Sequence, residues 1–584
     1  MCGIVGALRA EWPGREAPAA ALAALGWRGP DDARLEAVGG WWLGVARLAI
    51  TDVGTPQPLR CPESGRVVAF NGAVTSAARE WAAVGTARVS ANDAELALHR
   101  FAAGGPEALT ATCGPYALAV VDPRDDSVWL ARDPEGEKPL FAVTRRGVLI
   151  AFASSVSALR ALGLDVRLGD EGLAQLLLYG FHLGPQIEGA GLELHGNWRG
   201  VLYAPRAAAM APVESGSPAE ANGVAPTQLR ARLDAAVTRC ATAEVPVGLC
   251  LSGGVDSSCM AASLARAGRS VPAYQLRARG APDEERGRAE RVARHTGHEL
   301  RRVDVGAEVL DALPRLTRCT GLPHGDPSVL ALHAVARAAR DDGVKVLLSG
   351  EGADDQWLGY RRDRAAAWLP ARGWSFVPQP GLRHDTVARF LRALGSPTPF
   401  DRLLEATPPR FLAEVVAPGA LPEAALPDLI FEPALSRARY AERAFYLRHD
   451  LLPKGDTATM AAGVEGRLPF LDPAVLTSAE TRSRDARHVL GKVALRRAYA
   501  ADLPPGILGR PKLGFGLPLD RWLRGDLWLV DVLRDRRTLA RPHLRGAGVA
   551  CVLDWHRAGR ANLGHGLYLL AAYEIYLREL EAAA

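Results

Sequence analysis

The sequence contains no stretch of about 20 uninterrupted apolar residues, which is the length that a membrane-spanning helix needs. Its start, MCGIVGALRAEWPGRE, has no basic segment followed by a long apolar run, so no secretory signal is expected. The eight cysteines include no CxxC pair, and none has a histidine partner at zinc-ligand spacing. These absences predict a cytoplasmic protein with reduced thiols and no membrane partner.

An excess of one charge is also absent, because 70 Lys+Arg stand against 65 Asp+Glu. The resulting net charge of +5 does not predict nucleic-acid binding. A composition of 48% hydrophobic and 23% charged residues is typical of globular proteins. Since 584 residues exceed what one ordinary core organises, we expect at least two domains.

The first 206 residues consist of short alternating segments broken by turns, among them RVVAFNGAV, YALAVVDP and SVWLARD. This pattern predicts an α+β domain of layered β-sheets with few helices, over residues 1–206. Residues 207–227 are rich in Ala, Pro, Gly and Ser and have no apolar periodicity. We expect them to form an interdomain linker.

From residue 228 to residue 584 the pattern changes to strands that alternate with helices. The segments VPVGLCL, SVPAYQL, HELRRVDV and VKVLLSG are predicted strands. Strands interleaved with helices indicate βαβ units, so we predict an α/β domain with a parallel sheet. Beyond about residue 360 the chain is expected to be mostly helical.

Cysteine at position 2 is the first candidate nucleophile. Removal of Met1 would leave Cys2 with a thiol and a free α-amine, and the amine can accept the thiol proton. Taken alone, a chance cysteine at this position is the simpler interpretation. The catalytic interpretation therefore depends on the residues that follow.

Those residues offer the groups that a glutamine site needs. Asn71-Gly72 ends the predicted strand VVAF and supplies a side-chain amide and an unhindered N–H for an oxyanion. Arg47 suits an α-carboxylate, Asp93 suits an α-ammonium, and Arg28 is a fixed cation in the turn WRGPD. Singly, each has a structural interpretation: a surface ion pair for Arg28, a hairpin turn for Asn71 and a helix N-cap for Asp93.

In order and spacing, these residues resemble the glutaminase domain of class II, N-terminal-nucleophile glutamine amidotransferases. ARDPEGEKPLF at residues 131–141 is similar to the RDxxGxKPLY segment of that family. The resemblance implies that Cys2 attacks the glutamine amide and that Asn71 and Gly72 form the oxyanion hole. It implies that glutamine is bound by Arg47, Leu48, Ala49, Ile50, Asn71, Gly72, Ala73 and Asp93.

One departure concerns the residue after Asn71-Gly72. The family usually has glutamate there, whereas this chain has Ala73. Loss of one charge-assisted hydrogen bond costs about 1.5–3 kcal/mol. The departure therefore predicts weakened glutamine binding more readily than an abolished reaction.

Two glycine-containing loops are candidate phosphate sites. SGGVDSS, residues 252–258, lies between a predicted strand and a predicted helix, where backbone N–H groups bind anions. SGEGADD, residues 349–355, follows another strand, so both loops are expected at the carboxyl edge of one sheet. The second loop alone is typical of a solvated acidic turn. The pair predicts magnesium-pyrophosphate binding by Asp256 and Asp354.

The two loops resemble the ATP pyrophosphatase domain of asparagine synthetases, as do LPKGDTATM at 452–460, EGRLPFLD at 465–472 and GKVALRRA at 491–498. The resemblance implies ATP and Mg²⁺, with Glu351 in acyl-adenylate chemistry and Lys454 stabilising transition-state charge. Lys492 competes with Lys454 for the phosphate contact. The implied ATP-binding residues are Cys250, Ser252, Gly253, Gly254, Val255, Asp256, Ser257, Ser258, Leu276, Ser349 and Gly350.

Three function classes stay open at this point. The combined resemblance predicts asparagine synthesis from aspartate, glutamine and ATP. The alternative is an amide-forming homologue of the lasso-peptide cyclase or β-lactam synthetase type with a weakened or vestigial glutaminase. Ala73 and the segment Thr320-Gly321-Leu322-Pro323 favour this alternative, and retention of Cys2 opposes a dead glutaminase. A non-catalytic protein is least expected because both loops are intact. Relatives of this architecture often form homodimers.

Overall fold

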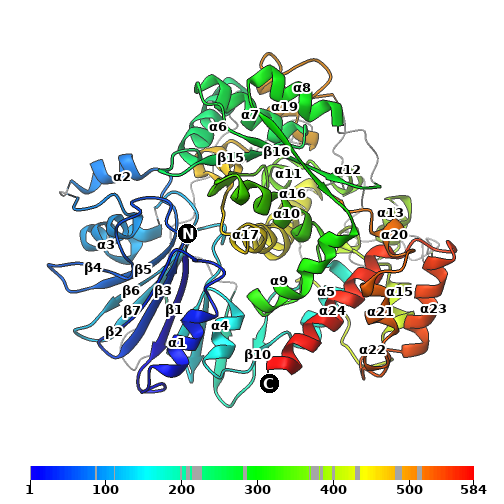
Figure 1. Ribbon diagram of the computed structural model, residues 1–584, viewed down its shortest axis with the longest axis horizontal. Helices are drawn as coiled ribbons and strands as arrows, with labels where there is room; N and C mark the ends of the chain where they lie inside the picture. Colours follow the sequence, from blue (N-terminus) through cyan, green and yellow to red (C-terminus); the bar gives the residue numbers. More distant parts are fainter. Residues whose placement is uncertain are drawn as a thin grey trace.

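The structure is a computed structural model of the chain (Figure 1). It describes residues 2–85, 88–110, 112–196, 200–204, 211–213, 226–280, 286–366, 369, 381, 386–396, 401–427, 434–479, 490–509 and 516–583.

The N-terminal part contains two six-stranded antiparallel sheets, as the alternating pattern predicted (Figure 1). The first sheet runs in the order β12 (Leu192–His195), β8 (Phe141–Arg145), β9 (Val148–Ala153), β1 (Cys2–Leu8), β3 (Trp41–Arg47) and β2 (Asp32–Val38). The second runs in the order β14 (Ala211–Val213), β13 (Gly200–Ala204), β7 (Ser127–Arg132), β6 (Tyr116–Asp122), β5 (Val67–Gly72) and β4 (Leu59–Arg60).

The side-chain period of two explains this layering. Along β1, Ile4 packs with residues of the second sheet, such as Val67, in a core between the sheets. Its neighbour Val5 faces the other way and packs against Leu22 and Leu159, in a core below helices. Helices α1 (Glu16–Ala23) and α4 (Val156–Ala161) thus cover the first sheet, while α2 (Ala77–Val84) and α3 (Asp93–Thr110) accompany the second.

A five-stranded parallel sheet forms the centre of the C-terminal part. Its order is β17 (Leu300–Val305), β16 (Ala273–Ala278), β15 (Val247–Cys250), β18 (Val346–Leu348) and β19 (Glu465–Arg467). Helices α6 (Pro226–Cys240), α7 (Val255–Arg266) and α8 (Arg286–Thr296) share one core with it, and α10 (Ser328–Asp341) packs on the other face. Four of these strands match the predicted segments. The fifth, β19, lies in the EGRLPFLD segment and was not predicted as a strand.

The remainder is helical, as expected, and gathers beside the parallel sheet (Figure 1). Its helices are α5 (Asp170–Tyr179), α9 (Leu313–Thr320), α11 (Ala353–Gln356), α12 (Arg361–Ala366), α13 (Thr386–Leu394), α14 (Asp401–Leu404), α15 (Pro409–Val415), α16 (Ala434–Ala441), a π-helical segment Glu442–Leu451, α17 (Leu452–Met460), α18 (Pro473–Ala479), α19 (Val493–Ala498), α20 (Leu519–Trp522), α21 (Trp528–Arg534), α22 (Arg536–Leu539), α23 (Gly546–Arg557) and α24 (Gly564–Ala583). In the described part of the chain, no helix combines the length and apolar character that crossing a bilayer requires.

The predicted linker, residues 207–227, lies mostly outside the described residues. Within it, Ala211–Val213 forms β14 and pairs with β13, so this stretch is not wholly irregular. Helix α6 begins at Pro226, inside the predicted range. The division into residues 1–206 and 228–584 stays a prediction.

Helix α17 connects the two parts of the molecule. It lies near the start of β1, at the centre of the structure (Figure 1). It packs on α10 and on β19 of the parallel sheet. Its residue Asp456 forms ion pairs with Arg28 and Lys138 of the N-terminal part, so α17 contacts both parts of the molecule.

Candidate active sites

Cys2 begins β1 and is buried, with 3% of its surface exposed. Its backbone nitrogen, which becomes the α-amine once Met1 is removed, donates to Asn71 Oδ1 at 3.0 Å. Asn71 Nδ2 is also buried and has no hydrogen-bond partner among the described residues, so this donor is available to an oxyanion. Gly72 is required because a Cβ at this position would lie 2.2 Å from Pro115 O.

A small pocket opens beside Cys2. Besides Cys2, six of the eight predicted glutamine-binding residues border it: Arg47, Leu48, Ile50, Gly72, Ala73 and Asp93. Asn71 and Ala49 are not part of this lining, and the backbone amide of Ala49 donates to Asp31 Oδ2 at 2.8 Å. The pocket volume is about 20 Å³, roughly the space of one water molecule.

Arg47 holds the loop that follows it. Its guanidinium donates to the carbonyl oxygens of Val53 at 2.8 Å and Asp52 at 2.6 Å. These contacts fix the Arg47 guanidinium at the pocket wall. The family resemblance implies that it binds the α-carboxylate of glutamine there.

Asp93 is not the N-cap of α3, because Asn92 Oδ1 accepts the Ala94 N–H at 3.0 Å in that role. Asp93 is the first helical residue, and its carboxylate accepts the Val74 N–H at 3.0 Å. Burial is the main cause that raises the pKa of Asp93 to about 7, and the nearby Glu465 adds to it. The carboxyl group thus changes charge near neutral pH.

Two residues that the sequence prediction missed come to the pocket wall from the other domain. Glu465 and Arg467 belong to β19 of the parallel-sheet domain, yet they line the pocket beside Cys2. They form a buried ion pair of 2.5 Å, with 1% and 3% of their side chains exposed. Because they lie almost 400 residues beyond Asp93, only the folded chain reveals their position.

The second site is a cavity of about 750 Å³ at the carboxyl edge of the parallel sheet, a size suited to a nucleotide with a second substrate. The predicted residues among its lining are Cys250, Ser252, Asp256, Ser257, Leu276, Ser349, Gly350, Glu351, Asp354 and Lys454. The two predicted loops meet here, since a Cβ on Gly350 would lie 3.0 Å from Asp256 Cβ.

Four predicted ATP residues, Gly253, Gly254, Val255 and Ser258, are not part of that lining. Gly253 has φ of +77° and packs against α8, where a Cβ would lie 2.5 Å from the Ala289 nitrogen. Gly254 and Val255 form the start of α7, and Ser258 is fully buried within it. These residues shape the loop and direct its helix N-terminus toward the cavity.

Lys492 lies between the two predicted metal carboxylates. Its Nζ is 2.5 Å from Asp256 Oδ2 and 2.6 Å from Asp354 Oδ1. Both carboxylates therefore face one point, and they are the side chains that would hold a Mg²⁺ ion in this cavity. No group of three or more potential metal-binding side chains occurs within the described ranges, so phosphate and water must complete such a site.

The backbone at Lys492 is held in the left-handed region, with φ of +62°. Hydrogen bonds from Gly491 N to Leu358 O at 2.8 Å and from Lys492 N to Trp357 O at 3.1 Å fix it there. A non-glycine residue in this region is strained, and such strain is typical of functional sites.

Lys454 of α17 lies at another wall of the same cavity. Its Nζ is 3.3 Å from Asp326 Oδ2 and 3.4 Å from Glu351 Oε1. Burial works against the charge, but Asp326, Glu351 and Asp450 outweigh it and raise the pKa of Lys454 well above its usual value. Lys454 is therefore a cation at neutral pH and not a general base.

Two residues further along α17, Asp456 joins the two domains. Arg28 Nη1 and Nη2 donate to its carboxylate, at 2.7 and 3.1 Å, and Lys138 Nζ donates at 3.3 Å. Arg28 Nε also donates to Cys2 O at 3.2 Å. The expectation of a surface ion pair for Arg28 is wrong, because only 1% of its surface is exposed. The WRGPD turn folds inward against α17.

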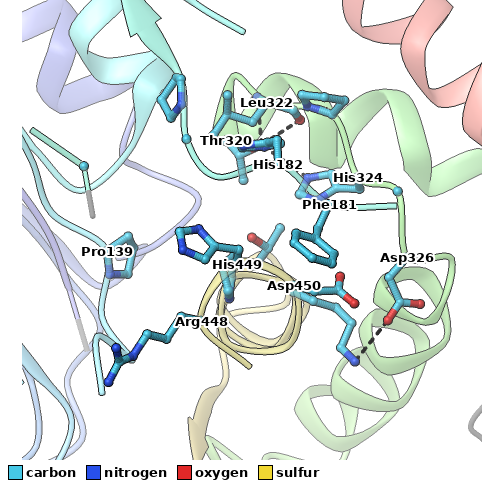
Figure 2. A pocket seen from close by; sticks show the side chains of 18 of the residues that line it. Pro139, Phe181, His182, Thr320, Leu322, His324, Asp326, Arg448, His449 and Asp450 are labelled. Carbon is cyan, nitrogen blue, oxygen red and sulfur yellow. Dashed lines mark hydrogen bonds and ion pairs between the residues drawn. The ribbon is translucent and has the colours of Figure 1, made fainter. Parts of the chain in front are cut away.

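A third cavity, of about 130 Å³, lies between the domains. It shares Asp326 and Lys454 with the nucleotide cavity, and Pro139 borders it from the N-terminal side (Figure 2). His182, His324 and His449 line it. Burial is the main cause that lowers their pKa values to about 4, 4 and 3, so all three imidazoles are neutral at pH 7.

The geometry defines a class of protein: a buried N-terminal thiol beside an oxyanion donor, and a phosphate-binding sheet edge with two acidic loops. Comparisons with known proteins agree. A family model described as asparagine synthase matches residues 228–578, and one described as a glutamine amidotransferase domain matches residues 1–192. The chain belongs to the asparagine synthetase family and is an ATP-dependent ligase with a glutamine amidotransferase domain.

Individual relatives align over most of the chain. A Mycobacterium tuberculosis protein that carries the name asparagine synthetase (glutamine-hydrolyzing) is 29% identical, over 94% of this chain and 91% of that protein. Asparagine synthetase (glutamine-hydrolyzing) 1 of Bacillus subtilis is 25% identical, over 91% of this chain and 89% of its own.

The pKa of Asp93 gives a first testable prediction. An ionised Asp93 attracts an α-ammonium and a protonated one does not, so recognition of that group should strengthen as pH rises through about 7. The measurement is kcat/KM for glutamine divided by that for glutaramate, which lacks the α-amine but undergoes the same chemistry. We expect this ratio to rise about tenfold between pH 6 and 8. Asp93→Asn should flatten it, and a flat wild-type profile would contradict the assignment.

Proposed function

We propose that this protein is a glutamine-hydrolysing asparagine synthetase that forms asparagine, AMP and pyrophosphate from aspartate, ATP and the nitrogen of glutamine. The observation that supports this most directly is helix α17, which brings Lys454 to the nucleotide cavity and Asp456 to the residues around Cys2. We assign the reaction to the cytoplasm, where these small-molecule substrates are available, and a homodimer is compatible with it.

In the proposed glutaminase reaction, the Cys2 thiol attacks the glutamine carboxamide. The α-amine of Cys2 accepts the thiol proton and passes it to the departing nitrogen. Asn71 Nδ2, which is buried without a partner within the described structure, supports the role of an oxyanion donor. Arg47 and Asp93 bind the amino-acid end of glutamine.

In the proposed synthetase reaction, a carboxylate oxygen attacks the α-phosphate of ATP and pyrophosphate leaves. The resulting acyl-adenylate is needed because a free carboxylate has no adequate leaving group. Ammonia then adds to the acyl carbon and AMP departs. Glu351, 3.4 Å from Lys454, lies where it can orient the acyl group.

The two competing lysines take separate roles in this proposal. Lys454 is near Glu351 and stabilises negative charge on the reacting acyl group. Lys492 is near Asp256 and Asp354 and contacts the leaving pyrophosphate. Asp256 and Asp354 would hold Mg²⁺, which neutralises phosphate charge when bound.

The histidine-lined cavity supports a protected route for ammonia. Ammonia in water at neutral pH is mostly ammonium, which is not a nucleophile. Neutral His182, His324 and His449, whose pKa values are lowered by burial, offer hydrogen bonds without a permanent charge, and charged side chains such as Arg448 and Lys454 also line the cavity. Shielding from water also protects the adenylate from hydrolysis.

A second candidate function is amide formation on another carboxylate in natural-product biosynthesis, with a weak glutaminase. Ala73, which supplies no carboxylate to the glutamine pocket, favours it. The two functions share the adenylation step and differ in the acyl substrate. They are therefore separated by which carboxylate triggers pyrophosphate release.

Pyrophosphate release with ATP and Mg²⁺ tests the proposal directly. We expect release to require aspartate and to proceed with either glutamine or ammonium. Cys2→Ala should abolish glutamate formation because the nucleophile is lost, while synthesis driven by ammonium persists. If aspartate yields no pyrophosphate with either nitrogen source, asparagine synthesis is wrong, and release triggered by another carboxylate would favour the second function.

Matched lysine variants test the division of roles. Lys454→Met should lower kcat for ammonium-driven synthesis by about 10²- to 10³-fold, as expected when a transition-state charge contact is removed. Lys492→Met should mainly raise KM for ATP, because it removes a phosphate contact. Initial rates of pyrophosphate release at varied ATP separate the two effects. The opposite pattern would exchange the assignments.

A further inference from the structure

The pocket beside Cys2 has a wall from the other domain. Residues of the N-terminal sheets form most of its lining, but Glu465 and Arg467 come from β19 of the parallel sheet. The side chain of Glu465 is 1% exposed, so its carboxylate meets no bulk solvent. A buried charge at a pocket wall requires a partner inside the protein or in the pocket.

Glutamine, the proposed substrate of this pocket, carries a positively charged α-ammonium group. A negatively charged side chain is needed to bind it. Of the described lining residues that the N-terminal domain contributes, Asp93 alone is acidic, and Ala73 adds only a methyl group. Near neutral pH Asp93 carries its charge only part of the time, because its pKa is about 7. One intermittently charged carboxylate is a poor match for a permanent cation.

Glu465 supplies the lasting charge. Burial opposes its ionisation, but the positive charges of Arg467, the N-terminus and Lys138 together outweigh burial and lower the pKa of Glu465, so this carboxylate is ionised throughout the neutral range. Asp93 and Glu465 both line this pocket. Arg467, which lines it too, lowers the pKa of Asp93, whereas Glu465 raises it.

The position of Glu465 is fixed by the parallel sheet. Its N–H donates to Lys345 O at 2.8 Å, and β19 runs parallel to β18 with Val346 opposite Glu465. Arg467 Nε donates to Glu465 Oε1 at 2.5 Å, and Arg467 Nη1 donates to the carbonyl oxygens of Cys240 and Thr242 at 2.9 and 2.7 Å. Arg467 thus anchors the carboxylate to the sheet and orients it.

We propose that Glu465 binds the α-ammonium of glutamine together with Asp93, so that the glutamine site is completed by the ATP-binding domain. This inference rests on the proposed glutaminase activity. It adds a carboxylate from β19 to a pocket in which Ala73 supplies none. The N-terminal domain alone then holds an incomplete glutamine site.

The test uses the full-length protein with Glu465→Gln, which keeps the shape and a hydrogen-bond acceptor for Arg467 but removes the charge. Glutamate formation is measured with glutamine, and glutarate formation with glutaramate, which has no α-amine. We expect kcat/KM for glutamine to fall about 10- to 100-fold and that for glutaramate to change little, because a charge-assisted contact is lost for glutamine only.

Glu574→Gln is the matched control. Glu574 is also fully buried and pairs with Arg541 at 2.8 Å and Arg578 at 2.7 Å, but it lies on α24 and lines neither substrate pocket. Thermal melting of both variants measures how much the stability of the folded protein falls when a buried charge is removed. The glutamine-to-glutaramate ratio of Glu574→Gln should equal that of the wild type.

A second variant restores the charge from the opposite wall. Adding Ala73→Glu to Glu465→Gln should recover the preference for glutamine over glutaramate. A wild-type ratio in the folded Glu465→Gln protein, an equal loss for both substrates, or no recovery in the double variant would each overturn the inference. A wild type that releases no glutamate, and whose Cys2 is not alkylated by the glutamine analogue 6-diazo-5-oxo-norleucine, would instead overturn the glutaminase function itself.

Discussion

The structure depends on one buried carboxylate, Asp456, which holds two cations of the other domain. Arg28 and Lys138 bind it at 2.7 and 3.3 Å, and burial is offset by both cations, so the pKa of Asp456 lies below its usual value. Removing one partner of such a cluster costs about 3–5 kcal/mol, because an uncompensated buried charge is left behind. The docking of the domains and the position of Cys2, whose carbonyl accepts from Arg28, follow from this contact.

Because Asp456 belongs to α17, the same contact sets the geometry of the second site. Lys454 precedes Asp456 by two residues, so its side chain leaves the opposite side of the helix and meets Glu351 and Asp326 in the nucleotide cavity. Thr457, next to Asp456, borders the cavity of neutral histidines. One nine-residue helix thus has residues near Cys2, in the nucleotide cavity and in the histidine-lined cavity between the domains. In the proposed function, this arrangement lets a neutral nitrogen nucleophile travel without meeting bulk water.

Local patterns predicted much of the fold. Alternation predicted β5, β6 and β7, and strand–helix alternation predicted four strands of the parallel sheet. The two acidic loops were expected to lie close together. Lys492 Nζ lies 2.5 Å from Asp256 Oδ2 and 2.6 Å from Asp354 Oδ1, so it contacts both loops. These features are readable because each is encoded in a short segment whose periodicity or glycine content has a direct physical meaning.

What the sequence did not reveal depends on contacts between distant segments. Arg28 looked like a surface cation because its partner Asp456 lies 428 positions away. Glu465 and Arg467 sit in a three-residue strand too short to show alternation. The histidines at positions 182, 324 and 449 share no spacing, and the fold alone brings them to one cavity. Each of these residues obtains its role from burial, which no single segment specifies.

The central claim is that the docked domains pass nitrogen from one site to the other without release. The most direct measurement supplies glutamine labelled with ¹⁵N at the amide, together with excess unlabelled ammonium, and determines the label in the amide product by mass spectrometry. We expect a product that carries mainly ¹⁵N in the wild type and a diluted label in Asp456→Asn, whose domain contact is weakened. A wild-type product whose label follows the bulk ammonium pool would contradict it.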